Sequence, residues 1–297
     1  MSRKIIIGSR GSDLALWQAH HVEAQLKALG HEVEIKIIKT QGDKIQHLSF
    51  DKMEGKGFFT KELEDKLLSG EIDLAVHSHK DLPTEHPDGL VIAAVSERED
   101  PRDLLLIRKE KTDNSKKFDL VENAIIGTSS ARRKSLLLHY RPDVEIKDLR
   151  GNVPTRINKL REGHYDAIML ATAGVERLKL DLSEFHILKL DPLQFIPAPA
   201  QGVLGLQIRE VDAELAIIID KLNDKAVAKR IGVERRILNL FEGGCQMPLG
   251  AYCTEDNGKL TVKACVADAW NAPVRISEKT GSEIEALAQE TVASLRF

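Results

Sequence analysis

The sequence predicts an α/β protein in which two similar lobes follow one another along the chain. A strand, a glycine-containing turn, a helix and a second strand occur in this order at 5–36 and again at 125–147. A helix end followed by an apolar run also occurs twice, at 66–76 and at 159–169. The chain has 297 residues, 42% of them hydrophobic, so it is long enough for two or three domains with buried cores.

In the first lobe, the apolar run 5–7 predicts a strand that ends at a turn formed by residues 8–12. The helix expected at 12–29 is amphipathic, and a strand at 33–36 follows it. The face that we expect to be buried consists of Leu14, Trp17, His21 or Val22, Leu26 and Leu29.

The segments 66–76 and 159–169 each predict a helix that stops at a glycine and is followed by a strand. The apolar run after the aspartate in each segment is typical of a strand covered on both faces, as in a parallel α/β sheet. A chance similarity between such short segments is the alternative interpretation.

The turns that begin the two lobes have the composition of anion-binding sites. The first turn contains Arg10 and Ser12, and the second contains Ser129, Arg132 and Arg133. Backbone N–H groups at a helix start, hydroxyls and guanidinium groups together bind carboxylate or phosphate. The simpler interpretation of either turn is a capping serine followed by solvated charges.

Three further arginines follow in the second lobe. Arg150, Arg156 and Arg177 each lie near an expected strand end or helix start, which adds cations for an anionic ligand. The chain contains no GxxxxGK[ST] sequence, so nucleotide hydrolysis is not indicated.

Acid–base chemistry is expected in the segment 76–83, directly after the buried strand of the first lobe. Asp81 follows Lys80, and a carboxylate close to cations stays ionised and can hold a positively charged ring or transfer a proton. His77 and His79 are two residues apart, but no third metal ligand follows at a diagnostic spacing, so we expect no metal site. The simpler interpretation of the two histidines is that they form a hydrogen-bonded framework under a cleft.

A long polar segment, 40–57, separates the second strand from the next helix. It has glycines near both ends, contains Lys52 and Lys56, and leads into 58–61. Loops of this length are either functional or disordered. The lysines and the glycines of this segment favour a mobile lid over an anionic ligand.

Cys245 lies in the segment 242–248, where two glycines and a proline prevent regular structure. This placement favours an exposed thiol, although an unpaired cysteine is more often buried. Cys253 and Cys265 lie in the apolar runs 249–254 and 260–267, which predict strands.

Composition excludes several classes of protein. Three cysteines without a CxxC pair argue against a disulfide framework or structural zinc and favour a reducing compartment, so we expect a cytoplasmic protein. No signal-peptide core or membrane-spanning run is present. A net charge of -3 and 4% aromatic residues do not indicate nucleic-acid binding.

Taken together, the motifs resemble one family over nearly the whole chain: the porphobilinogen deaminases, or hydroxymethylbilane synthases, of tetrapyrrole and haem biosynthesis. The resemblance depends on an ordered set of short segments, each of which could be accidental by itself. They are 9–12, 14–19, 55–59, 61–63, 77–83, 97–103, 127–130, 149–153, 201–202 and 242–246.

The resemblance implies two periplasmic-binding-protein-like α/β lobes plus a smaller α+β C-terminal domain. Lobe one would comprise 1–100 plus 197–217, and lobe two 101–196. The C-terminal domain, 218–297, would carry the cysteine loop.

The resemblance also implies a reaction. Cys245 would form a thioether to a dipyrromethane cofactor, which acts as a primer for the addition of four porphobilinogen molecules. Each molecule loses ammonia to give an electrophilic methylene-pyrrolenine, which the terminal pyrrole attacks, and water releases hydroxymethylbilane. Asp81 would hold pyrrole N–H groups and stabilise the cationic intermediates.

Other site residues follow from matching positions. The cofactor would be bound by Lys80, Asp81, Ser129, Arg132 and Arg133, and the substrate by Arg10, Ser12, Arg150, Arg156, Arg177, Gln201 and Gly202. Lys56 and Phe59 would belong to the lid. We expect porphobilinogen as the partner, no nucleic acid or membrane, a monomer, and hand-over of product to the next enzyme.

Three positions depart from the family pattern: Asp13 replaces proline, His79 replaces an often apolar residue, and Pro199 to Gln201 replaces a glycine-rich approach. Two other functions remain open at this stage. An anion-binding module would use the same arginines but form no covalent adduct. A thiol enzyme would use Cys245 as nucleophile and His77 or His79 as base.

Overall fold

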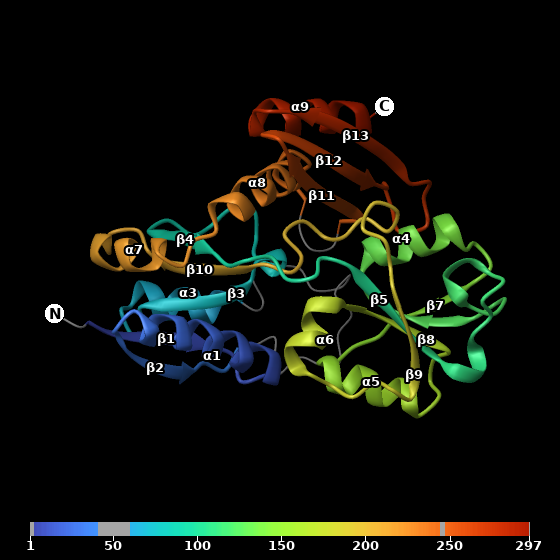
Figure 1. The fold of residues 1–297 in the computed structure, drawn as a ribbon, viewed down its shortest axis with the longest axis horizontal. Helices are drawn as coiled ribbons and strands as arrows, with labels where there is room; N and C mark the ends of the chain where they lie inside the picture. Colours follow the sequence, from blue (N-terminus) through green and yellow to red (C-terminus); the bar gives the residue numbers. More distant parts are fainter. Residues whose placement is uncertain (1–2, 41–59, 244–246, 297) are drawn as a thin grey trace. The chain divides into compact units, whose positions relative to one another are not determined.

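The computed structural model describes residues 3–40, 60–243 and 247–296 (Figure 1). The described part of the chain divides into two compact units. One contains the residues up to Glu99 together with Gly202–Lys229, and the other contains Asp100–Gln201 together with Arg230–Phe297. Among the described residues, no helix is long and apolar enough to cross a membrane.

Lobe one is built on a five-stranded sheet with the order β2-β1-β3-β10-β4. Its strands are β1 (Lys4–Ser9), β2 (Glu32–Ile37), β3 (Leu74–Ser78), β4 (Leu90–Val95) and β10 (Leu204–Arg209), and its helices are α1 (Asp13–Ala28), α3 (Lys61–Leu68) and α7 (Ala213–Asp220). Strand β10 is antiparallel to β3 and β4, whereas β1 is parallel to β2 and β3. The sheet is therefore mixed, and β3 is buried on both faces as expected.

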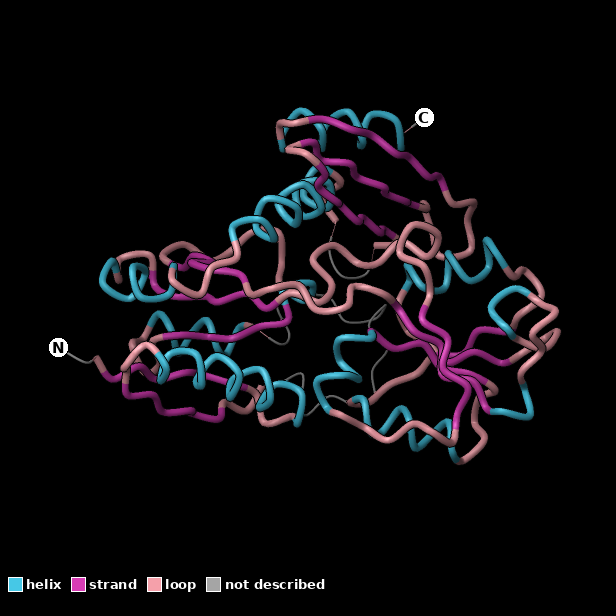
Figure 2. The backbone as a smooth tube through the Cα atoms, in the orientation of Figure 1, coloured by secondary structure: helices cyan, strands magenta, loops and turns pink. Residues whose placement is uncertain are grey.

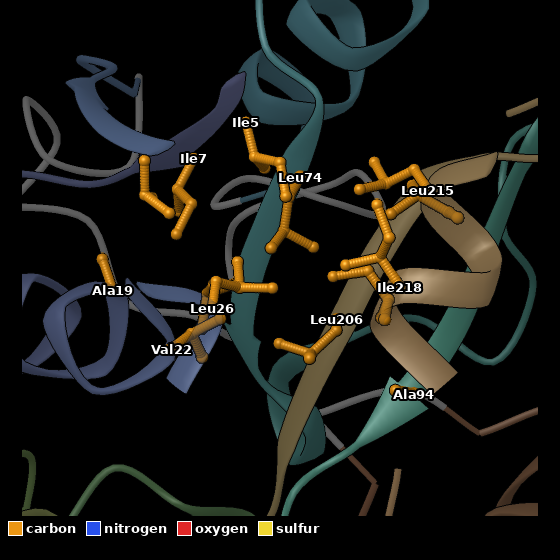
Figure 3. Close-up of a cluster of buried hydrophobic side chains, with 14 of the residues drawn as sticks. Ile5, Ile7, Ala19, Val22, Leu26, Leu74, Ala94, Leu206, Leu215 and Ile218 are labelled. Atoms are coloured by element: carbon orange, nitrogen blue, oxygen red, sulfur yellow. The ribbon is translucent and has the colours of Figure 1, made fainter. Parts of the chain in front are cut away.

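The core of lobe one lies between this sheet and helices α1 and α7 (Figure 3). Figure 3 shows Leu26 of α1 and Leu215 of α7 near side chains from the central strands. Our expectation for the buried face of α1 was wrong in part: Leu29 is 40% exposed, and Leu14 and Trp17 are only half-buried. The buried residues of α1 are Gln18, Ala19, Val22 and Leu26.

Lobe two repeats this topology with the order β7-β6-β8-β5-β9. Its strands are β5 (Asp103–Arg108), β6 (Ile125–Gly127), β7 (Glu145–Lys147), β8 (Ala167–Ala171) and β9 (Phe185–Lys189); its helices are α4 (Ala131–Tyr140), α5 (Val153–Arg161) and α6 (Thr172–Leu178), with 3-10 turns η3 (Lys109–Lys111) and η4 (Lys117–Asp119). Strand β5 is antiparallel to β8 and β9, as β10 is to β3 and β4. The chain crosses from one lobe to the other just before each antiparallel strand. It passes from β4 of lobe one to β5 of lobe two, and later from β9 of lobe two to β10 of lobe one.

The internal repeat also extends to the helix ends. Gly70 follows α3 with a φ of 75°, and Gly163 follows α5 with a φ of 79°. These are left-handed conformations that glycine adopts without steric cost. The predicted glycine caps are confirmed.

The C-terminal part consists of α8 (Lys225–Leu240), β11 (Leu249–Asp256), β12 (Lys259–Val266), β13 (Arg275–Gly281) and α9 (Ile284–Leu295) (Figure 2). Its antiparallel sheet packs against α8 and α9 through an apolar cluster that includes Val233, Val262 and Leu287. Cys253 and Cys265 lie in the two predicted strands and are buried, and Cys265 packs into the core of lobe two.

The predicted fold class, two α/β lobes of the periplasmic-binding-protein type with a smaller α+β C-terminal domain, is confirmed by these three sheets. The exact domain borders given above stay a prediction.

Candidate functional site

A cavity of about 110 Å³ lies in lobe one beside the carboxyl ends of β1 and β3. These are neighbouring parallel strands, so the segments that follow them meet at one edge of the sheet. The cavity is lined by Arg10, Leu14, Ala15, Gln18, Thr60, Leu63, Val76, His77, Ser78 and Asp81. The structure thus brings two predicted site residues, Arg10 and Asp81, to one cavity.

Asp81 is held by a short turn that follows β3 directly. The turn is a 3-10 helix, η2 (His79–Asp81), and the backbone N–H of His79 donates to Val203 O at 2.9 Å. Asp81 is exposed, whereas Lys80 is half-buried and His79 is buried. The turn therefore presents one carboxylate and one ammonium group where the strand ends.

Helix α1 contributes the opposite side of the cavity. Gln18 is buried, and its Nε2 donates to Ser78 Oγ at 2.8 Å. The Ser12 hydroxyl accepts a hydrogen bond from Ala15 N and so caps α1, as the simpler interpretation of this turn expects. Its role as a substrate ligand stays a prediction.

His77 lines the cavity and belongs to a chain of buried polar groups. Its Nε2 is 3.0 Å from Gln207 Oε1, and Gln207 Nε2 donates to Glu64 Oε1 at 3.3 Å. Thr60 Oγ1 donates to the other carboxylate oxygen of Glu64 at 3.3 Å. Burial lowers the pKa of His77 to about 4, so the imidazole is neutral at pH 7. The hydrogen-bonded framework expected for the histidines is present at His77.

In lobe two, the turn after β6 is organised by hydroxyl groups. Ser130 Oγ accepts from Arg133 N at 3.5 Å and caps α4. Ser129 Oγ donates to Leu149 O and accepts from Leu149 N, both at 3.0 Å. Ser129 thus joins this turn to the segment that contains Arg150.

Arg132 and Arg133 surround a buried carboxylate that our sequence analysis did not single out. Asp103 is 0% exposed; Arg132 Nη1 donates to its Oδ2 at 2.6 Å, and Arg133 Nη2 donates to its Oδ1 at 2.7 Å. Gln201 Nε2 donates to the same Oδ1 at 3.0 Å. Burial acts to raise the pKa of Asp103, but the two guanidinium groups outweigh burial and hold it below its usual range.

The sequence contains a signal that would have indicated this cluster. Asp103 opens the strand β5, whose next four residues are apolar and buried. A carboxylate at the start of such a strand needs a cationic partner, because an isolated buried charge is very costly. Gln18, Glu64 and Gln207 were also missed, since polar residues on apolar faces do not show which cavity they line.

The other predicted arginines of lobe two lie in different environments. Arg150 is half-buried, and Arg156 Nε donates to Gly151 O at 2.7 Å within the first turns of α5. Arg177 is buried in the last turn of α6, the short helix that directly follows β8. Their roles as substrate ligands stay predictions.

Three predicted residues lie outside the described part of the chain: the lid residues Lys56 and Phe59, and Cys245. Gly202 is described, and its backbone has a φ of 92°. No group of three or more residues of the kinds that bind metal is found among the described side chains.

Comparison with known proteins decides the family. Residues 5–217 match the model of the porphobilinogen deaminase dipyrromethane cofactor binding domain, and residues 228–295 match the model of the porphobilinogen deaminase C-terminal domain. The chain belongs to the porphobilinogen deaminase family.

Individual relatives agree with this assignment. A porphobilinogen deaminase of Nitratiruptor is 48% identical over 264 residues, which cover 89% of this chain and 83% of the relative. The porphobilinogen deaminase of Maridesulfovibrio salexigens is 44% identical over 301 residues, covering 98% and 96%.

The chain is also similar to solved structures of low sequence identity. One is a probable amino-acid ABC transporter extracellular-binding protein of Bacillus subtilis, with 12% identity over 75% of this chain and 90% of that protein, and a TM-score of 0.45.

The residues around Asp103 fit the carboxylate-bearing dipyrromethane cofactor of porphobilinogen deaminases. Two buried guanidinium groups face one buried carboxylate. Arg132 Nε is also buried and donates to no described residue. A buried guanidinium group with an unsatisfied donor is suited to an anionic ligand group.

Proposed function

We propose that this member of the porphobilinogen deaminase family polymerises four porphobilinogen molecules head to tail, with loss of ammonia, and releases hydroxymethylbilane by hydrolysis. As a family member it is a transferase of tetrapyrrole biosynthesis with a dipyrromethane cofactor. When bound, this cofactor supplies the terminal pyrrole on which the product chain grows. Everything else must come from the side chains of the protein.

The observation that supports the lobe-one cavity as the reaction site is the position of Asp81. It is an exposed carboxylate at the end of a buried strand, on the wall of a cavity that also contains Arg10. Loss of ammonia from an aminomethylpyrrole leaves positive charge on the ring. A carboxylate fixed next to that charge stabilises it, and the same group can accept a hydrogen bond from a pyrrole N–H.

Cations are needed for the acetate and propionate groups of the substrate. We assign substrate binding to the following residues, with the arginines on the carboxylates: Arg10, Ser12, Arg150, Arg156, Arg177, Gln201 and Gly202. Guanidinium groups suit this role because they bind carboxylates through two parallel hydrogen bonds.

We assign the cofactor to Cys245 through a thioether, with its carboxylates bound by Lys80, Ser129, Arg132 and Arg133 and its pyrrole N–H groups by Asp81. The unsatisfied Nε of the buried Arg132 supports this assignment. Lys56 and Phe59 would close over the site as part of a lid.

We also propose that the protein acts as a cytoplasmic monomer and passes its product to the next enzyme. Its three cysteines without a CxxC pair support a reducing compartment. Hydroxymethylbilane is an open chain of pyrroles, so the reaction that uses it as a linear precursor of a ring would be catalysed by the enzyme that receives it.

The test is the substitution Asp81→Asn, which removes the negative charge but keeps the size of the side chain. We expect kcat to fall by a factor of about 100 or more, because the cationic intermediates lose their counter-charge. Asp88→Asn is the matched control, since Asp88 is also exposed and does not line the cavity. Equal activity of Asp81→Asn and the control would contradict the proposal.

A further inference from the structure

The buried chain Thr60–Glu64–Gln207–His77 connects three elements beneath the lobe-one cavity. Thr60 and Glu64 belong to the start of α3, Gln207 to β10 and His77 to β3. All four residues are at most 7% exposed. Such a chain costs free energy unless its donors and acceptors match, so it restricts the orientation of each member.

The orientation of Gln207 follows from the carboxylate beside it. Both oxygens of the Glu64 carboxyl group accept a hydrogen bond, Oε1 from Gln207 Nε2 and Oε2 from Thr60 Oγ1, each at 3.3 Å, so the NH2 group of Gln207 faces Glu64. The carbonyl oxygen of Gln207 then faces His77 at 3.0 Å. Because a carbonyl oxygen only accepts, His77 Nε2 must carry a proton.

The charge state of His77 decides what its other nitrogen can do. Burial is the main cause of its lowered pKa, and the neighbouring His86 and Arg10 also disfavour a positive charge on the His77 ring. The ring is therefore neutral at pH 7, with its single proton on Nε2. Nδ1 carries a lone pair and is a hydrogen-bond acceptor.

The lone pair of Nδ1 is not used within the described part of the protein. The interaction of the His77 ring with Gln207 is made by Nε2, and no described residue donates to Nδ1. His77 lines the cavity together with Asp81 and Gln18. An acceptor thus lies in the wall of a cavity that already contains a carboxylate.

We propose that His77 is a substrate-binding residue: Gln207 fixes the neutral Nε2–H tautomer, and Nδ1 accepts a hydrogen bond from an N–H group of the bound aminomethylpyrrole. This inference rests on the proposed function of the cavity. The substrate offers two kinds of N–H donor, the pyrrole nitrogen and the ammonium of its aminomethyl group. Its carboxylates cannot bind to a lone pair, so His77 and Arg10 recognise opposite ends of the ligand.

Glu64 acts on this arrangement through Gln207. Burial raises the pKa of Glu64 above its usual range, in spite of the hydrogen bonds from Gln207 and Thr60. If Glu64 donated a proton toward Gln207, the amide of Gln207 could turn over, and the proton of His77 would move to Nδ1. The hydrogen bond that Glu64 accepts from Gln207 therefore keeps Nδ1 an acceptor.

The first test is ¹⁵N NMR of the histidine rings in the cofactor-loaded, full-length protein. The sequence has 10 histidines, and the resonances of His77 are those missing from His77→Gln. We expect the Nε2–H tautomer in the free enzyme, and a shift of the Nδ1 resonance alone when porphobilinogen is added. A proton on Nδ1 in the free enzyme, or an Nδ1 resonance unchanged by saturating substrate, would overturn the proposal.

Kinetics of two variants provide the second test. The amide of His77→Gln reaches the Nε2 position and keeps the contact with Gln207, whereas the amide of His77→Asn occupies the Nδ1 position. We expect His77→Gln to raise the KM for porphobilinogen about tenfold, and His77→Asn to raise it less. Equal KM values for wild type and a folded His77→Gln would contradict the role of Nδ1.

These outcomes separate the inference from the proposed function. If Asp81→Asn is inactive but His77→Gln is normal, the cavity is the reaction site and only the role of His77 is wrong. If Asp81→Asn is fully active, the cavity itself is not the reaction site, and the proposed role of His77 is lost with it.

Discussion

Asp73 and Asp166 make the same pair of contacts in the two lobes. Asp73 N donates to Ile6 O at 2.8 Å, and its Oδ2 accepts from Ile6 N at 3.0 Å. Asp166 N donates to Ile125 O at 2.8 Å, and its Oδ2 accepts from Ile125 N at 2.9 Å. Each aspartate therefore joins β1 or β6 to the strand that follows the glycine-capped helix, β3 in lobe one and β8 in lobe two.

Substitution of these aspartates tests the repeat as a source of stability. We expect Asp166→Ala to lower the free energy of unfolding by about 1–3 kcal/mol, because Ile125 N loses its acceptor. Asp73→Ala should cost more, since Asp73 also accepts from Arg209 at 2.8 Å and from Arg3 at 3.4 Å, whereas the further partner of Asp166 is the more exposed Lys111 at 3.1 Å. Urea unfolding measures both changes, with Asp88→Ala as the exposed control. A loss for Asp166→Ala no larger than that of the control would be evidence against this role.

The second prediction concerns the buried carboxylate of lobe two. Asp103→Asn leaves Arg132 and Arg133 without their counter-charge, so we expect a loss of about 3–5 kcal/mol in the free energy of unfolding. Asp148→Asn is the control: it weakens the ion pair with Lys134, but Asp148 is 47% exposed, so about 1 kcal/mol or less should be lost. Similar losses in both variants would contradict the buried-charge argument.

The third prediction is a pH dependence of stability caused by His77. Its pKa is about 4 in the folded protein and near 6.5 in the unfolded chain, so below pH 6.5 the unfolded state binds more protons. Stability is therefore lost as the pH falls from 6.5 to 4, by an amount on the order of 3 kcal/mol.

His77→Gln provides the control for this pH dependence, because it removes the titrating ring. Urea unfolding of wild type and variant from pH 7 to pH 4 gives the difference that His77 causes. The two proteins should diverge only below pH 6.5, with the wild type losing more stability. Parallel curves over this range would show that the folded and unfolded pKa values of His77 are the same.

The fourth prediction concerns Gly202, where the chain re-enters lobe one. Its φ is 92°, and an added Cβ would lie 2.5 Å from Glu99 O, a backbone atom that cannot move aside easily. We expect Gly202→Ala to cost about 2–4 kcal/mol. Gly258 also has a positive φ but open space around it, so Gly258→Ala should cost about 1–2 kcal/mol. Thermal unfolding that ranks the two variants equally would rule out the close approach to Glu99.

The sequence was sufficient to predict elements whose signals are local. The glycines at 70 and 163 and the strands around Cys253 and Cys265 follow from neighbouring residues. The mixed character of the sheets could not be predicted in this way, because Leu204 of β10 pairs with Ser78, far away in the chain. The partners of Arg132 were missed for the same reason: Asp103 meets it only through the pairing of distant strands.

In the candidate site, too, contacts between residues that are distant in the sequence could not be predicted. Asp81 could be proposed from its place after a buried strand, whereas the chain from Thr60 to His77 depends on contacts between α3, β10 and β3. Gln207 is a polar residue between the apolar residues Leu206 and Ile208. Such a residue indicates a buried partner but does not identify it.

The most direct test of the proposed mechanism is intact-protein mass spectrometry with peptide mapping, on protein purified from cells that make porphobilinogen. The result expected is a mass excess of two linked pyrrole units on the peptide that contains Cys245, absent from Cys245→Ser and retained in Cys265→Ser. An unmodified Cys245 in protein that is active with porphobilinogen, or the adduct on another residue, would contradict the assignment of Cys245 as the cofactor anchor.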